Sequence, residues 1–380
     1  MCKNHTAPFR ADHVGSYLRP AAIVEAREKF NKGEITADEL KQVEDKEIKI
    51  LVEKQKAAGL KGITDGEFRR AYWHLDFFWG LNGVEHTQAQ SGYQFHDETT
   101  KADSASLSGK ITGDNHPFVE DFKFIRDLAG EGYVARQTLP APAQFYFELV
   151  RDADHVAKTF AVYSDKKELF ADIATAYRKV IADLYEAGCR NIQIDDCTWG
   201  ALVDDKLIGR IASGQGKTGS ELRDELSADF LELNNAILEG QPEDLNLNTH
   251  VCRGNFHSTW ACEGSYESVA ETLFVEENIN GYYLEFDTER SGGFEPLAKL
   301  PKGKKVVLGL ITSKFADLED KEEVIARIHE AAKYVPLENL YLSTQCGFAS
   351  TEEGNILTEE DQWKKIALIQ EIVKEVWGDR

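Results

Sequence analysis

Four side chains of the types that bind zinc lie near the ends of predicted strands. His250 and Cys252 are two residues apart in T-H-V-C, Glu285 lies in Y-L-E-F-D, and Cys346 lies in S-T-Q-C-G-F. In an extended strand, residues i and i+2 point to the same face, so His250 and Cys252 can reach one ion. Two sulfurs, one nitrogen and one carboxylate suit zinc better than magnesium or calcium. We therefore predict a zinc site formed by these four residues.

A second interpretation of the same residues is structural. A His-x-Cys pair occurs by chance, and a buried cysteine is a common small residue of protein cores. The zinc interpretation gains weight because all the proposed ligands fall at strand ends, where a barrel brings side chains into one cavity. We interpret the other cysteines Cys189, Cys197 and Cys262 as structural.

Eight short apolar segments, most of them followed by a stretch of helical periodicity, indicate repeated β-α units. The predicted strands span residues 11–17, 62–68, 134–142, 191–197, 245–252, 281–287, 305–312 and 341–348. Amphipathic helices are predicted at 36–59, 166–188 and 220–240, each closing with glycine. This alternation favours an α/β fold, a single (β/α)8 TIM-type barrel, over an open parallel sheet, which a count of strands alone does not exclude.

One region interrupts this alternation. Residues 85–115 carry Gly, Ser, Thr and Asp among short alternating pieces, which predicts a small β-hairpin insertion and not a second domain. Without an internal repeat or an interdomain linker, we expect one catalytic domain over residues 1–380. The oligomeric state is left open.

Composition narrows the classes of partner. The 380 residues carry a formal net charge of −22, which repels phosphate backbones and anionic lipids, so we expect neither nucleic acid nor membrane partners. No apolar run approaches the roughly 18 residues of a membrane span, and the first residues lack the apolar core of a secretory signal. We expect a cytoplasmic protein.

Motifs along nearly the whole chain resemble one family. H-V-G-S near the start, D-G-E-F-R-R, Q-I-D-D, T-H-V-C, Y-L-E-F-D and Q-C-G are similar to motifs of the cobalamin-independent methionine synthase family. The similarity extends to the catalytic C-terminal half of the long, two-barrel members. The chain therefore resembles their short, single-barrel relatives.

The resemblance implies a function and a set of residues. The family's zinc ligands correspond to His250, Cys252, Glu285 and Cys346, which implies Zn2+ as the cofactor. Its homocysteine-binding residues correspond to Val14, Gly15, Ser16, Glu67 and Asp195. The implied reaction is methyl transfer to the thiol of homocysteine to form methionine, from 5-methyltetrahydrofolate or a simpler methyl donor.

The implied chemistry is physically consistent with these residue types. Coordination to zinc deprotonates a thiol at neutral pH, and the resulting thiolate attacks an electrophilic methyl carbon. Glu67 and Asp195 would hold the substrate ammonium, and backbone N–H groups near Gly15 and Ser16 its carboxylate.

The chain departs from the family at the methyl-donor half of the site. Long members use a histidine after the seventh strand as proton donor to the folate nitrogen, where this chain has Thr312 or Ser313 in G-L-I-T-S-K. Their pterin-stacking tryptophan is also missing from L-P-A-P-A-Q-F. The catalytic acid is thus unassigned, with His74 and His257 as candidates by motif position. The aromatic residues Tyr72, Trp73, His74, Phe77 and Phe78 either line a donor pocket or pack in the core.

Two other functions stay open. The family also resembles epoxyalkane:coenzyme M transferases, so zinc-dependent alkyl transfer to another thiol is one alternative. Glu67 and Asp195 argue against it, because carboxylates suit an ammonium and not a sulfonate thiol. The other alternative is a non-catalytic barrel that binds zinc or a thiol, since structural zinc sites are closed by four protein ligands.

Overall fold

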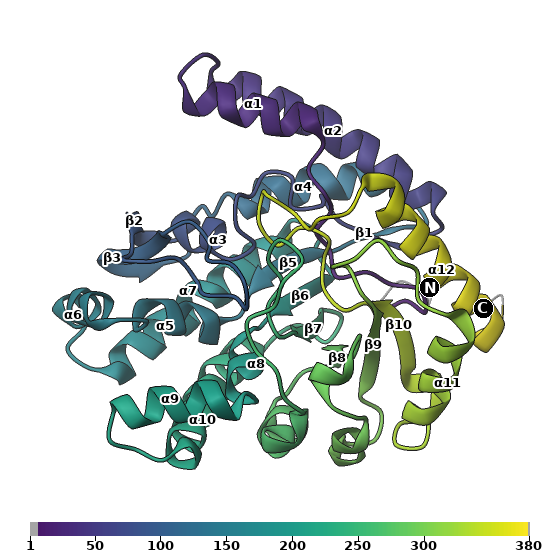
Figure 1. The fold of residues 1–380 in the computed structure, drawn as a ribbon. Helices are drawn as coiled ribbons and strands as arrows, with labels where there is room; N and C mark the ends of the chain where they lie inside the picture. The colour runs from purple at the N-terminus through teal and green to yellow at the C-terminus, as the bar shows by residue number, and fades with distance from the viewer. Residues whose placement is uncertain (1–6, 379–380) are drawn as a thin grey trace.

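The computed structural model describes residues 7–378, and residues 1–6 and 379–380 of the predicted domain lie outside the described part. Its central element is a parallel sheet with helices packed around it (Figure 1). The strands are β1 (Gly62–Ile63), β2 (Asn82–Gln88), β3 (Asp103–Thr112), β4 (Val134–Ala135), β5 (Gln137–Pro140), β6 (Asn191–Asp195), β7 (Asn246–Val251), β8 (Gly281–Glu285), β9 (Lys305–Ile311) and β10 (Leu340–Thr344).

Most of the helices follow strands along the chain and cover the outside of the sheet, whereas α1 and α2 precede β1. They are α1 (Ala21–Asn31), α2 (Ala37–Ala57), α3 (Leu75–Gly80), α4 (Phe118–Ala129), α5 (Pro142–Leu149), α6 (Ala153–Val162), α7 (Lys166–Glu186), α8 (Thr198–Leu202), α9 (Asp205–Gly214), α10 (Gly219–Leu238), α11 (Lys321–Ala331) and α12 (Glu359–Trp377). The connection between β7 and β8 contains the 3-10 helix Tyr266–Ser268 and the π-helix Glu271–Glu276.

Six parallel strands pair in the order β10-β9-β8-β7-β6-β5. All are parallel because a helical or irregular crossover returns the chain to the same end of the sheet. The strands are buried nearly throughout, as is typical of a parallel sheet covered by helices. The carboxyl ends of these strands therefore meet at one end of the sheet.

Segment 11–17, predicted as the first strand, forms no regular strand. Only two isolated parallel bridges connect it to the sheets, one from Ala11 to Leu342 of β10 and one from Ser16 to Gly66 after β1. Gly15, with φ of +140°, lies between them in a conformation outside the strand region. The prediction of a strand was therefore wrong for this segment, although its two ends lie beside the expected neighbours.

Two other predicted strands are shorter or divided. The strand predicted at 62–68 is reduced to β1, which pairs in parallel with β4. The segment predicted at 134–142 is divided into β4 and β5, with β5 pairing with β6. The remaining five predicted strands coincide with β6 to β10. Each of these strands ends earlier than predicted.

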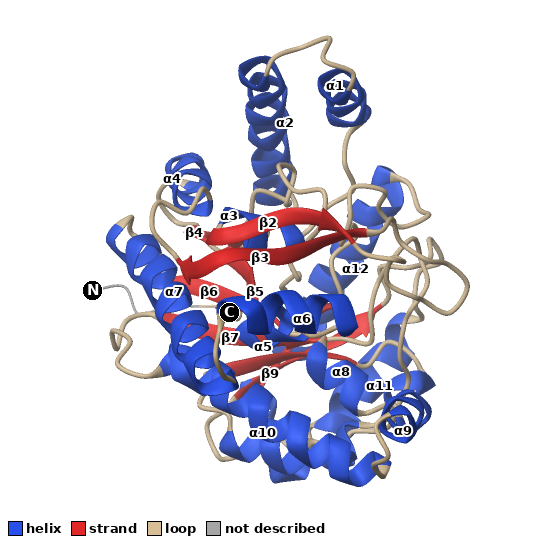
Figure 2. Ribbon diagram, turned by 90° about the vertical axis from the view of Figure 1, so that its left-hand side faces the viewer, coloured by secondary structure: helices blue, strands red, loops and turns tan. Residues whose placement is uncertain are grey.

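The hairpin insertion is confirmed. Strands β2 and β3 pair antiparallel from residue 82 to 112, somewhat earlier than the predicted 85–115. The loop between them, residues 89–102, carries side chains to the functional cavity described below. Figure 2 shows the hairpin above the parallel strands, on the side of α3 and α4.

The three predicted helices coincide with α2, α7 and α10 to within about two residues at either end. Thr36 caps α2 by accepting a hydrogen bond from the Glu39 backbone N–H, and the Glu39 carboxylate accepts one from the Thr36 backbone N–H. α1 and α2 project together from the body of the molecule in Figure 2. Among the described residues, no helix has the length and apolar character needed to cross a membrane.

A buried ion pair ties the N-terminal segment to the sheet. Asp12 accepts a hydrogen bond from Arg136 at 2.9 Å and another from the hydroxyl of Tyr283 at 2.7 Å. Both charged side chains are 1% exposed. The carboxylate and the guanidinium depend on each other, because either one alone would be an uncompensated charge in the interior.

We predict that Asp12→Ala lowers the free energy of unfolding by about 3–5 kcal/mol, because it leaves Arg136 buried without its partner. Denaturant unfolding followed by circular dichroism measures the change. Glu263→Ala is the matched control, because its partner Lys206 and Glu263 itself are largely exposed. Equal effects of the two substitutions would show that the buried pair does not anchor this segment.

Candidate metal centre

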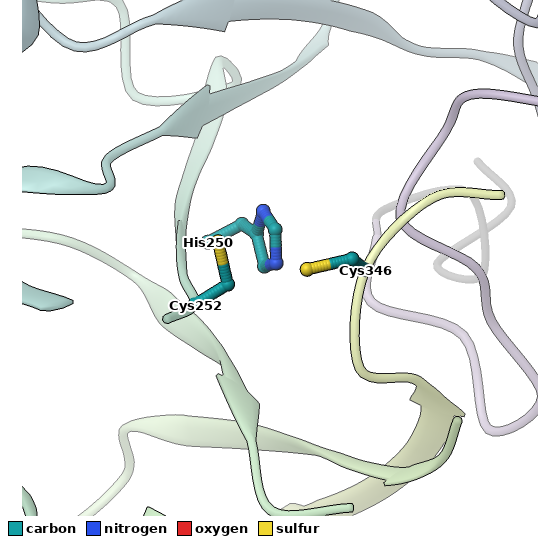
Figure 3. A group of neighbouring side chains, drawn as sticks. All are labelled: His250, Cys252 and Cys346. Atoms are coloured by element: carbon teal, nitrogen blue, oxygen red, sulfur yellow. The ribbon is translucent and has the colours of Figure 1, made fainter. Parts of the chain in front are cut away.

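Three of the predicted ligands meet at the carboxyl ends of two strands. His250 lies in β7, Cys252 follows directly after it, and Cys346 follows β10. Their potential ligand atoms all lie within 4.8 Å of one another, and all three side chains are buried. Figure 3 shows the imidazole and the two thiols directed toward a common point. The alternation of side chains along β7 therefore positions His250 and Cys252 on one face, as predicted.

The neighbours of Cys252 favour the thiolate form of its sulfur. Hydrogen bonds from the thiols of Cys197 and Cys346 keep the pKa of Cys252 well below its usual value of 9. Burial and the hydrogen bond to Cys252 raise the pKa of Cys346 instead. A pair of thiols that share a proton in this way is ready to exchange that proton for a metal cation.

Asp195 orients the imidazole of His250. The register of β6 and β7 sets these two residues opposite each other, and Asp195 Oδ1 lies 2.9 Å from His250 Nδ1. Burial disfavours the imidazolium, but the hydrogen bond to Asp195 and the charge of Cys252 outweigh it and raise the pKa of His250 to about 9. A carboxylate on one ring nitrogen fixes the orientation of a metal-binding histidine. His250 Nε2 lies 3.1 Å from the carbonyl oxygen of Gln345, beside Cys346.

Glu285, the fourth predicted ligand, lies outside the group of atoms within 4.8 Å. It ends β8 and is fully buried, and its carboxylate accepts hydrogen bonds from the Arg253 backbone at 2.7 Å and from Arg290 at 2.9 Å. The ammonium of Lys314 lies 3.7 Å from the same carboxylate. Burial raises the pKa of Glu285. In this arrangement Glu285 neutralises cations next to the cluster.

Cys197, interpreted from the sequence as structural, joins the cluster. It follows β6, and its sulfur lies 3.3 Å from that of Cys252. The signal that would have identified it is its place two residues after Asp195 at a strand end. Cys262 lies on the cavity wall, whereas Cys189 is buried and its thiol donates to the carbonyl of Asn191.

A cavity of about 330 Å³ opens onto the cluster. Cys252, Cys346 and His250 line it together with Glu67 and Asp195. Val14 and Ser16 lie on its wall, whereas the intervening Gly15 does not. A larger hollow of about 580 Å³ lies against α10, and neither histidine nor cysteine lines it. Because the smaller of the two cavities is lined by histidine and cysteine, it is the candidate functional site.

Glu67 presents an unused carboxylate oxygen at this cavity. Its Oε1 accepts hydrogen bonds from Thr138 at 2.9 Å and Arg70 at 3.2 Å, whereas its buried Oε2 has no partner among the described residues. Burial raises the pKa of Glu67 to about 7, against the lowering effect of Arg70. Glu67 also has a φ of +60°, an unusual value that costs about 1–3 kcal/mol and is typical of functional sites.

Gly15 has a structural reason to be glycine. Its φ is +140°, and a Cβ there would lie 2.9 Å from the Thr138 side chain. Its carbonyl oxygen accepts a hydrogen bond from Thr64 at 2.6 Å, and that of Val14 accepts one from Gln193 at 2.7 Å. These bonds hold the segment from Val14 to Ser16 at the cavity.

An aromatic wall lies across the same cavity. Tyr72, Trp73 and His74 line it, as one interpretation of the sequence expected. Phe77 and Phe78 instead pack in the core with no exposed surface. Loop 89–102 completes the wall with residues that sequence analysis did not single out, Tyr93 and Phe95 among them.

The two histidines proposed as acids differ in position. His74 is 4% exposed and lies on the cavity wall. His257 has a side chain 41% exposed and lies 2.9 Å from Glu98, and it is absent from the described residues that line the cavity. Of Thr312 and Ser313, the two residues that the resemblance sets at the position of a histidine, Ser313 is buried and donates a hydrogen bond to the carbonyl of Gly347.

The donor set fits a zinc ion. An imidazole and two thiols, one of them with a lowered pKa, provide soft and borderline ligands within reach of a single tetrahedral centre. The same cluster faces a cavity large enough for a small ligand, which leaves a coordination position open to a substrate. The fold and the site together define an α/β enzyme-like protein with a Cys- and His-rich candidate metal centre at the carboxyl ends of its strands.

Comparisons with known proteins agree with this class. The family described as "Cobalamin-independent synthase, Catalytic domain" matches residues 9–103 and 162–364. The chain therefore belongs to the cobalamin-independent methionine synthase family. The uncharacterized protein YxjH of Bacillus subtilis is 45% identical over 378 residues, which cover 99% of this chain and 96% of that protein.

Two solved structures are similar to this one. A putative vitamin-B12-independent methionine synthase from Listeria monocytogenes aligns with a TM-score of 0.76 and 40% identity, over 99% of this chain and all of that chain. A B12-independent methionine synthase from Shewanella, solved with selenomethionine, aligns with a TM-score of 0.71 over 97% of this chain and 98% of that chain. At 20% identity, the second shows a shared fold.

We predict that the purified protein retains about one zinc per chain, and that Cys252→Ser and Cys346→Ser each remove most of it. Loss of a sulfur removes both negative charge and softness from the site. Elemental analysis after dialysis measures the content. Cys189→Ser is the matched control, because Cys189 is buried outside the cluster and should leave zinc in place. Full zinc in both cluster variants would contradict the assignment.

Proposed function

We propose that the protein is a zinc-dependent S-methyltransferase that methylates the thiol of homocysteine to form methionine. The observation that carries this proposal is a shared cavity. The His250, Cys252 and Cys346 cluster opens into the same space as the unpartnered carboxylate oxygen of Glu67. A thiol-activating centre and an ammonium-binding carboxylate in one small cavity match an amino-acid thiol.

The chain's own residues provide the binding steps. Glu67, through its free oxygen, and Asp195 provide negative charge for the substrate ammonium. The segment from Val14 to Ser16 lies beside Gly66, and Val14 and Ser16 line the cavity, so that its backbone N–H groups are available to bind the substrate carboxylate. This arrangement directs the substrate sulfur to the cluster, because the two charged ends of the amino acid are held away from it.

A bound zinc ion would lower the pKa of the substrate thiol so that the sulfur reacts as a thiolate. Within the proposal, His250, Cys252 and Cys346 hold the ion, and Glu285 completes the set after leaving its present partners Arg290 and Arg253. The proposal also includes a closed barrel of one domain, in which segment 11–17 takes the place of the first strand.

The methyl donor is proposed to be small. The cavity of about 330 Å³ is near the lower limit for small-molecule sites, and its wall is largely apolar. Arg253, the one arginine or lysine on that wall among the described residues, is directed to the carbonyl of Gly264 and stacks on Tyr266. Little positive charge is therefore left to hold a polyglutamate tail. We place the reaction in the cytoplasm, with homocysteine and this donor as the partners.

We predict that Glu67→Gln weakens binding of homocysteine about 10- to 100-fold, while binding of 4-mercaptobutyrate, which lacks the amino group, changes much less. Isothermal titration of the zinc-loaded protein measures both. Asp195→Asn should show the same selectivity with an additional loss of metal, since Asp195 also contacts His250. Equal weakening of the two thiols would show that Glu67 does not bind the amine and would favour alkyl transfer to another thiol.

We further predict that a small sulfonium donor transfers its methyl group to homocysteine faster than methylfolate polyglutamate does. A sulfonium leaves as a neutral sulfide and needs no proton, whereas the folate nitrogen is a poor leaving group until it is protonated. Steady-state rates with S-methylmethionine and with methyltetrahydrofolate triglutamate compare the two. Faster turnover with the triglutamate would contradict the proposed donor preference.

A further inference from the structure

A chain of buried hydrogen bonds begins at the aromatic wall of the cavity. His74, which precedes α3, has its Nε2 3.0 Å from the hydroxyl of Tyr93 in loop 89–102. The Tyr93 hydroxyl in turn donates a short hydrogen bond to the carboxylate of Glu148 in α5. His74 and Tyr93 both line the cavity, and Glu148 has no exposed surface. A carboxylate is thus connected to the cavity through two groups that can transfer protons.

The chain continues from Glu148 toward the surface. Its second oxygen accepts a short hydrogen bond from the hydroxyl of Ser104 in β3. Ser104 Oγ lies 2.8 Å from His155 Nε2, and His155 Nδ1 lies 2.8 Å from Asp152 Oδ1. The side chain of Asp152 is 33% exposed. Each link between the cavity and solvent is therefore a group that both donates and accepts, or a carboxylate.

At the cavity end of this chain of hydrogen bonds, the hydrogen-bonding capacity of His74 is not fully used. His74 Nδ1 is buried and has no hydrogen-bond partner among the described residues, although Nε2 is paired. Burial, with a smaller contribution from Arg151, lowers the pKa of His74 to about 3. The ring is therefore neutral, with one nitrogen that donates and one that accepts. A neutral imidazole of this kind can accept a proton at one nitrogen as it gives one up at the other.

We propose that His74 is the catalytic acid for the methyl donor, and that Tyr93 and Glu148 resupply its proton. The inference rests on the proposed function and replaces the histidine that the chain lacks after β9. It assigns the role to His74 and not to His257, which is partly exposed and bonded to Glu98.

The step balances in atoms and electrons. The acceptor sulfur forms a bond to the methyl carbon as the bond between that carbon and the leaving atom breaks, and the electron pair stays on the leaving atom. That atom takes the proton of His74 Nδ1, while Nε2 takes the proton of Tyr93 and Tyr93 takes one from the Glu148 carboxyl. The product state has Tyr93 donating to a carboxylate, which is the arrangement observed. Solvent returns one proton to Glu148 through Ser104, His155 and Asp152, and the acceptor thiol has released one.

Charged neighbours surround the relay. Arg151 lies 3.4 Å from Glu148 and its guanidinium stacks on the ring of Tyr93 at 4.3 Å. On the other side, the ring of Tyr72 meets His74 edge-on, and its hydroxyl donates to Asp103 at 2.8 Å. Arg151 thus places a positive charge beside the carboxyl group that ends the inner part of the relay.

The relay determines which donors the site can use. When a methyl group is transferred from a neutral nitrogen, that nitrogen departs as an anion unless it is protonated. Donors of this class therefore need the acid. A sulfonium donor does not need it. The enzyme is therefore expected to accept both classes, with the nitrogen donors dependent on His74 and its relay.

The test compares two donors in the zinc-loaded, full-length protein. Transfer to homocysteine is measured with methyltetrahydrofolate monoglutamate, whose nitrogen must be protonated, and with S-methylmethionine. We expect Tyr93→Phe and Glu148→Gln to lower the ratio of folate to sulfonium kcat about 100-fold. Tyr185→Phe is the matched control, because it removes a hydroxyl bonded to the exposed Asp244 far from the relay. It should keep the wild-type ratio.

A second readout separates proton transfer from a structural defect. With the folate donor, the wild-type kcat should be slower in deuterated water, and this isotope effect should shrink in Tyr93→Phe. Two outcomes overturn the relay alone. In the first, the ratio of folate to sulfonium kcat in both variants stays within about threefold of the wild-type ratio. In the second, the wild-type protein transfers the methyl group from the sulfonium but not from the folate. No methyl transfer from either donor to homocysteine overturns the proposed function and the relay with it.

Discussion

The parallel register of β6 and β7 sets the geometry on which the rest of the site depends. It pairs Asp195 with His250, so that the carboxylate of one strand fixes the imidazole of the next. Once this ring is oriented, the period of two along β7 brings Cys252 to the same face. The end of β10 then needs to contribute only Cys346, whose neighbour Gln345 contacts the same imidazole through its carbonyl.

This arrangement concentrates negative charge among buried side chains. The pKa of Cys252 is lowered by hydrogen bonds from the thiols of Cys197 and Cys346. Burial and the hydrogen bond to Cys252 raise the pKa of Cys346, and the hydrogen bond to Cys252 and burial raise that of Cys197. The protons on the thiols of Cys346 and Cys197 limit the buried negative charge of the cluster. A divalent cation would take over that task and release those protons, which makes the cluster a better ligand set than a structural core.

Periodic features of the sequence predicted the structure best. Strands β6 to β10, three helices and the hairpin follow from apolar alternation and from glycines after helices. Segment 11–17 was misjudged because Gly15 has a φ of +140°, outside the strand region, and its backbone lies close to the Thr138 side chain, which only the folded chain reveals. Cys197 was missed because its closeness to Cys252 arises from pairing between strands, and the ion pairs of Glu285 depend on Arg253 and Arg290 from other loops.

The central claim is that the acceptor thiol binds through its sulfur to a zinc ion held by His250, Cys252 and Cys346. X-ray absorption at the zinc edge, recorded with and without homocysteine, tests this most directly. The account predicts that the number of sulfur neighbours of zinc rises by about one when homocysteine is added. A sulfur count that does not change, while homocysteine is shown to be bound, would contradict it.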